Sequence, residues 1–390
     1  MKKNLVVILG SGASFDSGYQ IHIGEKAISP PMDTNFFQEI PDDLLREEYY
    51  AIWKFKKLYF PSNQNYRMED VWTAVDLNHK HIRLGTYNWA IENGEYQTGE
   101  YFTFGKKYPE MDMISPITYL PNSGGGILHA PSYNEYKFLG DCGRDFRRLI
   151  YNIYSLYTPP QEGLDNFKLL HSKLRSLYQC KLLAYVTFNY DCYLEHALNP
   201  NFKYITTNDN AEEIILLLHG EVPVIKLHGS LNWRESRNPR MIFYNAPPFE
   251  KSRQIEPAYY SDGQWFQPAI IPPTIFKQEI NDDARTSDIL TQAILQQWRA
   301  AIRLLIEADK VIIIGYSFPA SDYHSKRILH IARMRRMMEK KPPFEIFHCS
   351  GSEDKTNKIL EIFGKESVIR IKNKFSDLCN SKELDDFLNL

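Results

Sequence analysis

Short, largely apolar runs alternate along the chain with longer stretches whose apolar residues recur at helical spacing. The most apolar runs are Leu5–Leu9, Leu182–Phe188, Val222–Leu227 and Val311–Ile314. Such runs are typical of strands that are covered on both faces of a parallel sheet. Further strands are predicted at Phe344–Phe347 and Val368–Ile371, and helices at Phe167–Tyr178, Ser287–Ala308 and Asp354–Phe363. This alternation predicts an α/β protein with a doubly wound, Rossmann-like parallel sheet.

The pattern changes between residues 32 and 160. Helical stretches at Asp42–Leu58, Met68–Leu84 and Asp141–Leu156 flank a long segment with many glycines and prolines, Glu92–Pro131. We predict a helix-rich insertion at residues 32–160, with residues 1–31 and 161–390 together forming the Rossmann-like domain. Arg234–Pro273, rich in proline and tyrosine, is predicted to be an irregular loop.

Five of the predicted strands end in glycine or a polar group. These ends are Gly10-Ser-Gly12, Asn189-Tyr-Asp191, His228-Gly229, Gly315-Tyr-Ser317 and Ser350-Gly351. Ligands of open parallel sheets bind beyond the carboxyl ends of the strands, and right-handed crossovers bring those ends to one edge. The sequence therefore predicts one polar site that is built from distant segments.

Each of these segments also has a plain structural interpretation. The glycine turn can simply lead into a helix that Ser14 caps, and Asp191 can cap a helix at Cys192–Leu198. A single histidine such as His228 is more often structural than catalytic. Tyr190 and Trp233 can either stack on a base or pack in the core.

Composition narrows the class of protein. The chain has 390 residues, 43% hydrophobic and 24% charged, which is typical of a soluble globular protein. Its net charge of −2 gives no overall attraction to nucleic acid or anionic membranes. The basic run Arg333–Lys341 is predicted to be a solvated helix face, with a nucleic-acid or partner patch as the alternative. No apolar stretch reaches the roughly 18 residues that span a membrane.

Cysteine usage indicates the compartment and argues against a metal site. The five cysteines have irregular spacing and include no C-x-x-C pair, so a zinc ribbon is not expected. Irregularly spaced thiols suit the reducing cytoplasm.

The order Gly-x-Gly-Ala-Ser, Asn-x-Asp, His-Gly and Gly-x-Ser resembles the sirtuin pattern. The segments Thr187-Phe-Asn-Tyr-Asp191, Lys226-Leu-His-Gly-Ser-Leu-Asn-Trp233 and Gly315-Tyr-Ser-Phe-Pro319 look like the bacterial sirtuin-like antiphage group. The resemblance covers about residues 4–18 and 165–351. Phe188 stands where classical sirtuins carry glutamine, and the zinc cysteines of protein deacylases are absent. Phe15 replaces the third glycine of a dehydrogenase fingerprint.

The resemblance implies an NAD hydrolase that releases nicotinamide and ADP-ribose. Asn189 would hold a ribose hydroxyl and water, and His228 would accept a proton from one of them. Asp191 would accept a hydrogen bond from the nicotinamide amide. Gly10, Gly12 and Ser14 would carry the pyrophosphate, and Ser317 would lie near the adenosine ribose. Ala13, Gly315 and Ser350 are expected to be further NAD-binding residues. NAD is then a substrate, and no bound cofactor or zinc is expected.

The same resemblance implies a role in antiphage defence by NAD depletion, with a HerA-type hexameric ATPase as a possible partner. We also expect a cytoplasmic homo-oligomer without membrane contact. Two alternatives remain open: a non-catalytic module that binds NAD or ADP-ribose, and an NAD-dependent protein deacylase. A nuclease has little support, because no acidic cluster has metal-ligand spacing.

Overall fold

The computed structural model describes residues 4–16, 21–23, 26–28, 34–60, 66–75, 133–156, 164–177, 182–206, 209, 221–237, 240–244, 258–259, 265–271, 289–318, 323–349, 353–364, 368–372 and 374–389. The chain divides into two compact units. Unit 1 comprises Met1–Met32, Tyr151–Ile271 and Lys277–Leu390, and unit 2 comprises Asp33–Ile150 and Pro272–Phe276.

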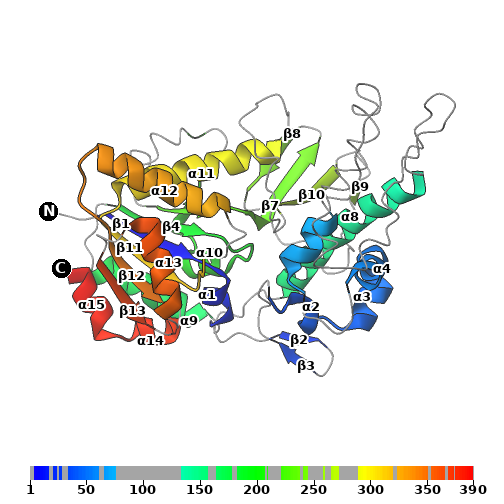
Figure 1. Ribbon diagram of the computed structural model, residues 1–390, viewed down its shortest axis with the longest axis horizontal. Coiled ribbons are helices and arrows are strands. Elements are labelled where there is room, and N and C mark those ends of the chain that lie inside the picture. Colours follow the sequence, from blue (N-terminus) through cyan, green and yellow to red (C-terminus); the bar gives the residue numbers. More distant parts are fainter. Residues whose placement is uncertain are drawn as a thin grey trace, which may run out of the picture. The chain divides into compact units, whose positions relative to one another are not determined.

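Unit 1 is built on a seven-stranded sheet in which all neighbouring strands are parallel (Figure 1). Its strands are β1 (Asn4–Leu9), β4 (Leu182–Thr187), β5 (Phe202–Tyr204), β6 (Val222–Lys226), β11 (Lys310–Ile314), β12 (Glu345–Cys349) and β13 (Val368–Lys372). The spatial order is β13-β12-β11-β1-β4-β6-β5. The predicted doubly wound, Rossmann-like sheet is confirmed, and β5 is an added edge strand.

The sheet reverses its winding direction at β1. From β1 the chain reaches β4, β5 and β6 on one side, and then β11, β12 and β13 on the other. The connections on the two sides of this point lie on opposite faces of such a sheet, which leaves a crevice at the carboxyl ends of β1 and its neighbours. This is the edge at which the polar strand ends were predicted to meet.

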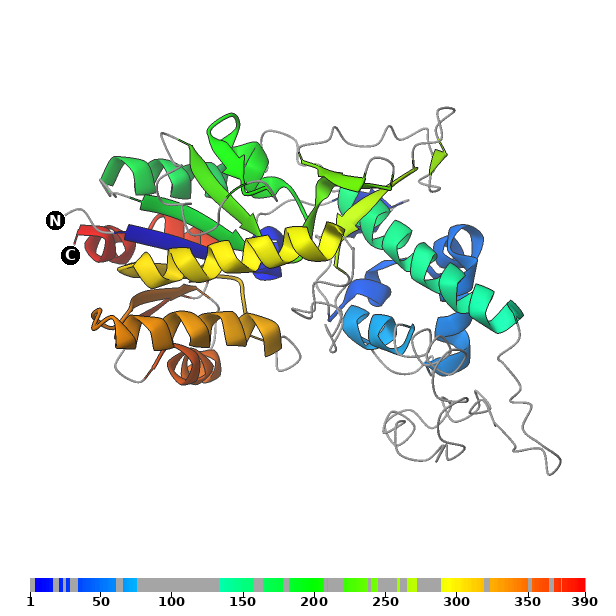
Figure 2. The ribbon, with the colours of Figure 1, turned by 90° about the horizontal axis from the view of Figure 1, so that it is seen from above.

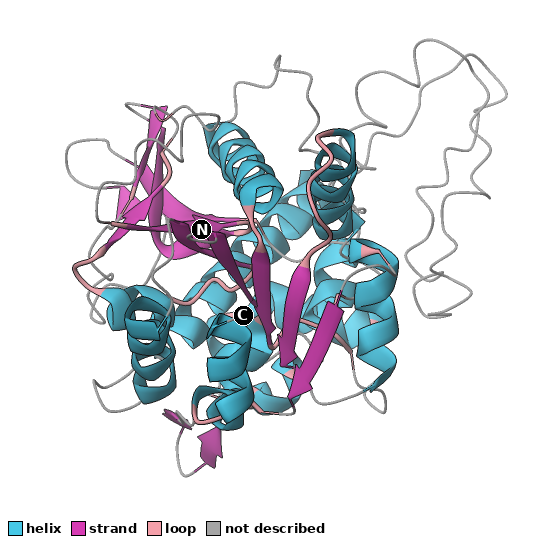
Figure 3. Ribbon diagram, turned by 90° about the vertical axis from the view of Figure 1, so that its left-hand side faces the viewer, coloured by secondary structure: helices cyan, strands magenta, loops and turns pink. Residues whose placement is uncertain are grey.

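Helices cover both faces of the sheet (Figures 1 and 3). One face carries α11 (Ile289–Glu307), α12 (Tyr323–Met338) and α13 (Glu353–Phe363). The other carries α9 (Asp165–Leu177), α10 (Tyr193–Leu198), α14 (Phe375–Cys379) and α15 (Lys382–Asn389). The short α1 (Ser11–Phe15) follows β1 directly. Helices α14 and α15 were not predicted.

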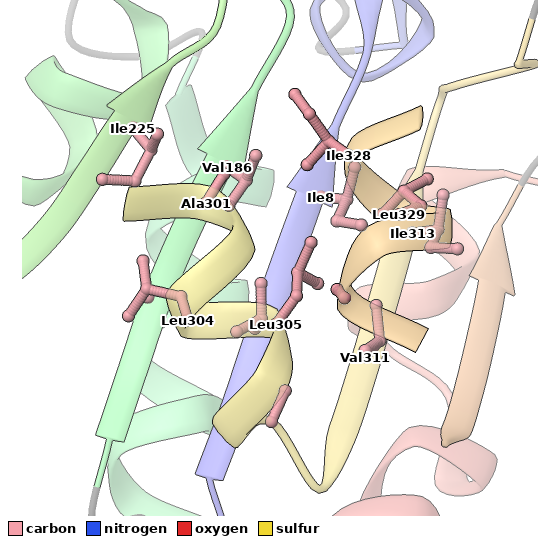
Figure 4. Close-up of a cluster of buried hydrophobic side chains, with 14 of the residues drawn as sticks. Ile8, Val186, Ile225, Ala301, Leu304, Leu305, Val311, Ile313, Ile328 and Leu329 are labelled. Carbon is pink, nitrogen blue, oxygen red and sulfur yellow. The ribbon is translucent and has the colours of Figure 1, made fainter. Parts of the chain in front are cut away.

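Alternate strand residues form the core below α11 and α12 (Figure 4). Ile8, Val186 and Ile313 point from three neighbouring strands toward α11 and α12. These three side chains, and Leu304 and Leu305 of α11, are each at most 2% exposed. Burial of such side chains contributes roughly 1.5 to 3 kcal/mol each. The sheet edge that carries the polar segments therefore rests on a closely packed support.

A second sheet of unit 1 contradicts the predicted irregular loop at Arg234–Pro273. It has the order β8-β7-β10-β9, with β7 (Gly229–Arg237), β8 (Arg240–Phe243), β9 (Ala258–Tyr259) and β10 (Trp265–Ile270), all antiparallel. Its longer strands lie beside one end of α11, lime green next to yellow in Figure 2. Pro268 is accommodated at a register shift of β10, so the proline does not exclude a strand here. A two-stranded sheet, β2 (Ile21–Ile23) and β3 (Lys26–Ile28), also belongs to unit 1.

Unit 2 is helical, with an aromatic core. It contains α2 (Phe36–Glu39), α3 (Asp42–Glu48), α4 (Tyr50–Tyr59), residues 68–75 and α8 (Tyr133–Leu156) up to Ile150. The ring of Phe146 lies 5.8 Å from that of Phe37 and 4.8 Å from that of Trp72. The single helix expected at Asp42–Leu58 is two helices, because Tyr49 has non-helical angles (φ −133°, ψ 50°).

The prediction of a solvated basic helix face is wrong at one position of α12. Arg336 is 3% exposed, and its guanidinium donates to the carbonyl oxygens of Ile306, Ala308 and Pro342. It thereby satisfies the carboxyl end of α11, where helix carbonyls lack intrahelical donors. Across the described ranges, no helix has the length and hydropathy that crossing a membrane would require.

Candidate functional site

Four of the five predicted strand ends lie next to one another. Main-chain hydrogen bonds connect them: Phe188 N donates to Leu9 O (3.0 Å), Leu227 N to Thr187 O (3.0 Å) and Gly10 N to Ile314 O (2.9 Å). The segments that follow β11, β1, β4 and β6 are thus held side by side. Ser350 and Gly351, the fifth segment, lie outside the described residues.

Two glycine turns pack directly against each other after β1 and β11. Gly12 N donates to Gly315 O (2.9 Å), and Gly315 has a φ of 64°. A Cβ atom on Gly315 would lie 2.1 Å from Ala13 N, and one on Gly12 would lie 2.8 Å from Gly315 Cα. Ala13 N donates to Gly10 O (2.9 Å). The glycines are therefore required for close contact of the two turns, whatever they bind.

A buried hydrogen-bond chain joins the turn after β1 to the turn after β4. Asn189 Nδ2 donates to Ser14 Oγ (2.9 Å), and Ser14 Oγ donates to Asp191 Oδ2 (2.7 Å). The three side chains are 9%, 3% and 7% exposed, in the order Asn189, Ser14, Asp191. Ser14 lies inside α1 and makes no cap hydrogen bond there, so the alternative interpretation of Ser14 as a helix cap is wrong.

The chain determines which end of the Asn189 amide remains available. Its second Nδ2 hydrogen is donated to Gly10 O (3.0 Å), so both amide hydrogens are used. The main-chain N–H of Asn189 donates to Thr187 Oγ1 (3.1 Å). Within the described part of the protein nothing donates to Asn189 Oδ1. The side chain thus presents an acceptor only.

Asp191 is held by hydrogen bonds to both carboxylate oxygens. Besides the Ser14 hydroxyl on Oδ2, Oδ1 accepts the main-chain N–H of Tyr193 (3.2 Å), the first residue of α10. Asp191 therefore does contact the helix start, as its capping interpretation required. Burial raises the pKa of the Asp191 carboxyl above its usual value, and the Lys226 ammonium and the Ser14 hydroxyl offset only part of that rise.

His228 stands between β6 and β7, where the chain passes from one sheet to the other. Its side chain is half-buried, and its ring centroid lies 5.5 Å from that of Phe188 and 6.1 Å from that of Tyr190. Gly229 follows with a φ of 82°, and a Cβ there would lie 2.1 Å from Ala269 O. The backbone of β10 therefore lies directly against Gly229. Just after β10, the N–H of Ile271 donates to His228 O (2.8 Å).

Aromatic rings occupy the space around these residues. Phe188 stacks on Tyr316, with centroids 3.9 Å apart and planes 5° from parallel, so the ends of β4 and β11 contact each other. Trp233 is fully buried against Tyr204 (5.3 Å) and Tyr244 (4.8 Å) and is a core residue. Ser317 is exposed at the same edge of the sheet.

Two charged residues at this edge were missed by the sequence analysis. Lys226, the last residue of β6, and Glu195 of α10 are 0% and 3% exposed, and Lys226 Nζ lies 3.0 Å from Glu195 Oε1. The one available signal was a lysine within an otherwise apolar strand. Among the described residues, His, Cys, Asp and Glu side chains do not gather into a group of three that could hold a metal.

Comparison with known proteins places part of this site in a named domain. Residues 183–262 match the family model of the SIR2-like domain. The match covers about a fifth of the chain and includes Asn189, Asp191 and His228. No curated protein matches the chain.

Several Sir2 homologues are among the solved structures that match this chain, all at TM-scores below 0.5. A crystal structure of a Sir2 homologue in complex with NAD is 14% identical, with a TM-score of 0.41 over 99% of this chain and 90% of that one. A histidine-to-asparagine mutant of a Sir2 homologue with ADP-ribose is 16% identical, with a TM-score of 0.34 over 63% of this chain and 76% of that one.

Proposed function

We propose that this protein hydrolyses NAD to nicotinamide and ADP-ribose at the edge formed by β1, β4 and β6. The observation that carries the proposal is the fixed Asn189 amide, which presents a lone acceptor next to the loop that carries His228. The match of residues 183–262 to the SIR2-like domain and the sirtuin-like strand ends support it.

The reaction breaks the bond between ribose C1′ and the nicotinamide nitrogen. The bonding electrons leave with nicotinamide, which departs as a neutral molecule, and positive charge develops on the ribose. Water then forms the new C–O bond at C1′ and loses a proton. Little acid catalysis is needed, so orientation of the ribose and the water is the main requirement.

Asn189 and His228 can meet this requirement. Asn189 Oδ1 accepts a hydrogen bond from a ribose hydroxyl or from the water, since both of its amide hydrogens are bound to Gly10 and Ser14. His228 accepts the proton released by the water or by a ribose hydroxyl, because an imidazole titrates near neutral pH. The rings of Phe188 and Tyr190 lie beside the imidazole, with centroids 5.5 and 6.1 Å from it.

The other site residues are proposed to bind the rest of NAD. The turn Gly10, Gly12, Ala13 and Ser14 is proposed to lie beneath the pyrophosphate. Ser317 is proposed to lie near the adenosine ribose, and Gly315 and Ser350 are proposed as further NAD-binding residues. Asp191 is proposed to face the nicotinamide amide through the same turn as Asn189, although its oxygens already accept from Ser14 and Tyr193.

The physiological role follows the resemblance to bacterial sirtuin-like defence proteins. We propose that NAD depletion in the cytoplasm limits phage growth, and that a homo-oligomer works with a HerA-type ATPase that controls activity. These proposals rest on the resemblance alone. They predict that the partner increases the rate of nicotinamide release from the same site.

Single variants of the two central residues test the assignment. His228→Ala and Asn189→Ala should each lower the rate of nicotinamide release about 100-fold or more. Thermal unfolding of His228→Ala should stay close to that of the wild type, whereas Asn189→Ala should unfold at a somewhat lower temperature, because Gly10 O and Ser14 Oγ lose a buried donor. Ser172→Ala, an exposed residue of α9, is the control and should keep the wild-type rate. Full activity in His228→Ala or Asn189→Ala would contradict the site. Release that requires an acyl-lysine peptide would instead favour the deacylase alternative.

A further inference from the structure

A fully buried ion pair lies directly beneath the turn that carries Asn189 and Asp191. Lys226 is 0% exposed, and its Nζ donates to the main-chain oxygen of Asp191 (2.5 Å). The same ammonium is 3.0 Å from Glu195 Oε1. One cation thus bonds both to the candidate turn and to the helix α10 that follows it.

Glu195 extends the pair to the neighbouring strands. Its Oε1 also accepts the Tyr204 hydroxyl (2.7 Å), and the Asn232 amide donates to that hydroxyl (3.0 Å). In the described part of the chain, no donor reaches Glu195 Oε2. Burial raises the pKa of Tyr204 well above its usual value, so the phenol stays protonated and can donate. Residues of β5, β6, β7 and α10 are therefore joined through one carboxylate.

Such a pair is a poor device for stability alone. Desolvation of two buried charges can exceed their attraction, and well-packed apolar residues often stabilise a protein as much. Burial by itself lowers the pKa of Lys226, but the nearby carboxylates, Glu195 foremost and then Asp191, raise it above the usual value, so the ammonium remains charged. A retained buried charge that bonds to the backbone of a candidate site indicates a positioning role.

We propose that Lys226, paired with Glu195, is a positioning residue that fixes the turn Asn189–Asp191 through its hydrogen bond to the Asp191 carbonyl. The catalytic consequence rests on the proposed function. Without this bond the turn loses its support from below, and Asn189 Oδ1 no longer stays where the ribose or water requires it. Misplacement by about 1 Å is enough to cost roughly 100-fold in rate.

The sheet provides a matched control at its opposite edge. Lys310, the first residue of β11, is also 0% exposed, donates to a main-chain oxygen, that of Phe387, and pairs with Glu345 (3.6 Å). Strands β6 and β11 run in the same direction in one parallel sheet. Lys226 is the last residue of β6 and therefore lies at the carboxyl edge of the sheet, whereas Lys310 is the first residue of β11 and lies at the amino edge. Lys226→Met and Lys310→Met therefore remove similar buried charges at different distances from the site.

The experiment compares both variants with the double variant Lys226→Met/Glu195→Gln, which leaves no unpaired charge. Lys226→Met should lower kcat for nicotinamide release at least about tenfold with KM nearly unchanged, and Lys310→Met should not. The double variant should recover unfolding temperature relative to Lys226→Met but not kcat. Hydrogen exchange of the peptide spanning residues 188–195, measured without NAD, should accelerate in both variants that lack Lys226 and not in Lys310→Met.

Each outcome decides whether Lys226 positions the turn or has only a structural role. Wild-type exchange of the 188–195 peptide in the double variant would overturn the positioning role, as would recovery of kcat together with stability. The exchange measurement is made without NAD, so it distinguishes failure of this inference from failure of the proposed function. If the wild-type protein shows no NAD turnover but exchange is faster in the Lys226 variants, only the proposed function is contradicted.

Discussion

At the scale of residues, the candidate site depends on polar side chains whose hydrogen bonds are almost fully used within the protein. Asn189 gives both amide hydrogens to protein acceptors, and Asp191 accepts at both oxygens. Each of these bonds reduces the ways in which the side chain can rotate. The site is thus organised before a ligand arrives, at the cost of burying a carboxylate.

The buried carboxylate makes a prediction about stability and pH. The folded pKa of Asp191 is raised above its usual 3.8, so the carboxylate destabilises the folded state once the pH exceeds the folded pKa. Asp191→Asn removes this penalty. The unfolding free energy of Asp191→Asn minus that of the wild type should therefore rise as the pH increases from about 3.8 through the folded pKa. The same variant should release nicotinamide more slowly than the wild type.

Asp42 provides a comparison of opposite sign in unit 2. Burial acts to raise its pKa, but the Trp53 hydrogen bond and the charges of Lys57 and Lys56 lower it below 3.8. Its stabilising contribution is present above pH 3.8 and is lost as the pH falls through the folded value, so Asp42→Asn should be less stable than the wild type at neutral pH. Urea unfolding at several pH values measures both variants. Equal pH dependence for the two would contradict the assignment.

At the scale of elements, parallel strands were easier to predict than antiparallel ones. Strands such as β1 and β11 are buried on both faces, so nearly every residue is apolar and the run stands out. Strands β7 to β10 mix polar and apolar residues and include Pro268, and only pairing across distant segments makes them strands. Their sheet could not be predicted from local composition.

The same reasoning explains which parts of the site were foreseen. Asn189 and His228 follow buried strands directly, so parallel topology alone placed them together. The Ser14–Asp191 bond spans 177 positions and depends on the exact packing of α1, which no local pattern encodes. Lys226 and Glu195 were missed because the sequence does not show which distant residue will pair with a charged side chain, although a lysine in the apolar strand β6 was a sign of burial.

The contact between the two glycine turns gives a prediction at this scale. Gly315→Ala places a Cβ 2.1 Å from Ala13 N in a left-handed conformation, so we expect a loss of at least about 1 to 3 kcal/mol. Gly143→Ala in α8 meets only a Trp72 ring atom at 3.9 Å and should be neutral or stabilising by about 0.5 to 1 kcal/mol. Chemical denaturation measures both. A tolerated Gly315→Ala would show that the turns can separate.

At the scale of the whole molecule, every described residue of the candidate site belongs to unit 1. That unit contains the seven-stranded sheet, the second sheet and the helices that cover them. The described residues to which the proposed chemistry is assigned are therefore all residues of one unit. The catalytic claim can be tested on the intact chain by supplying NAD alone.

The most direct test is the product balance of the purified chain incubated with NAD, in the absence of any peptide. We predict nicotinamide and ADP-ribose in equal amounts, with an equal loss of NAD, and release about 100-fold slower or more in His228→Ala. Tight binding of NAD without any product, also when the proposed ATPase partner is present, would contradict hydrolysis and favour a sensor. Absence of both binding and products under the same conditions would contradict the nucleotide site itself.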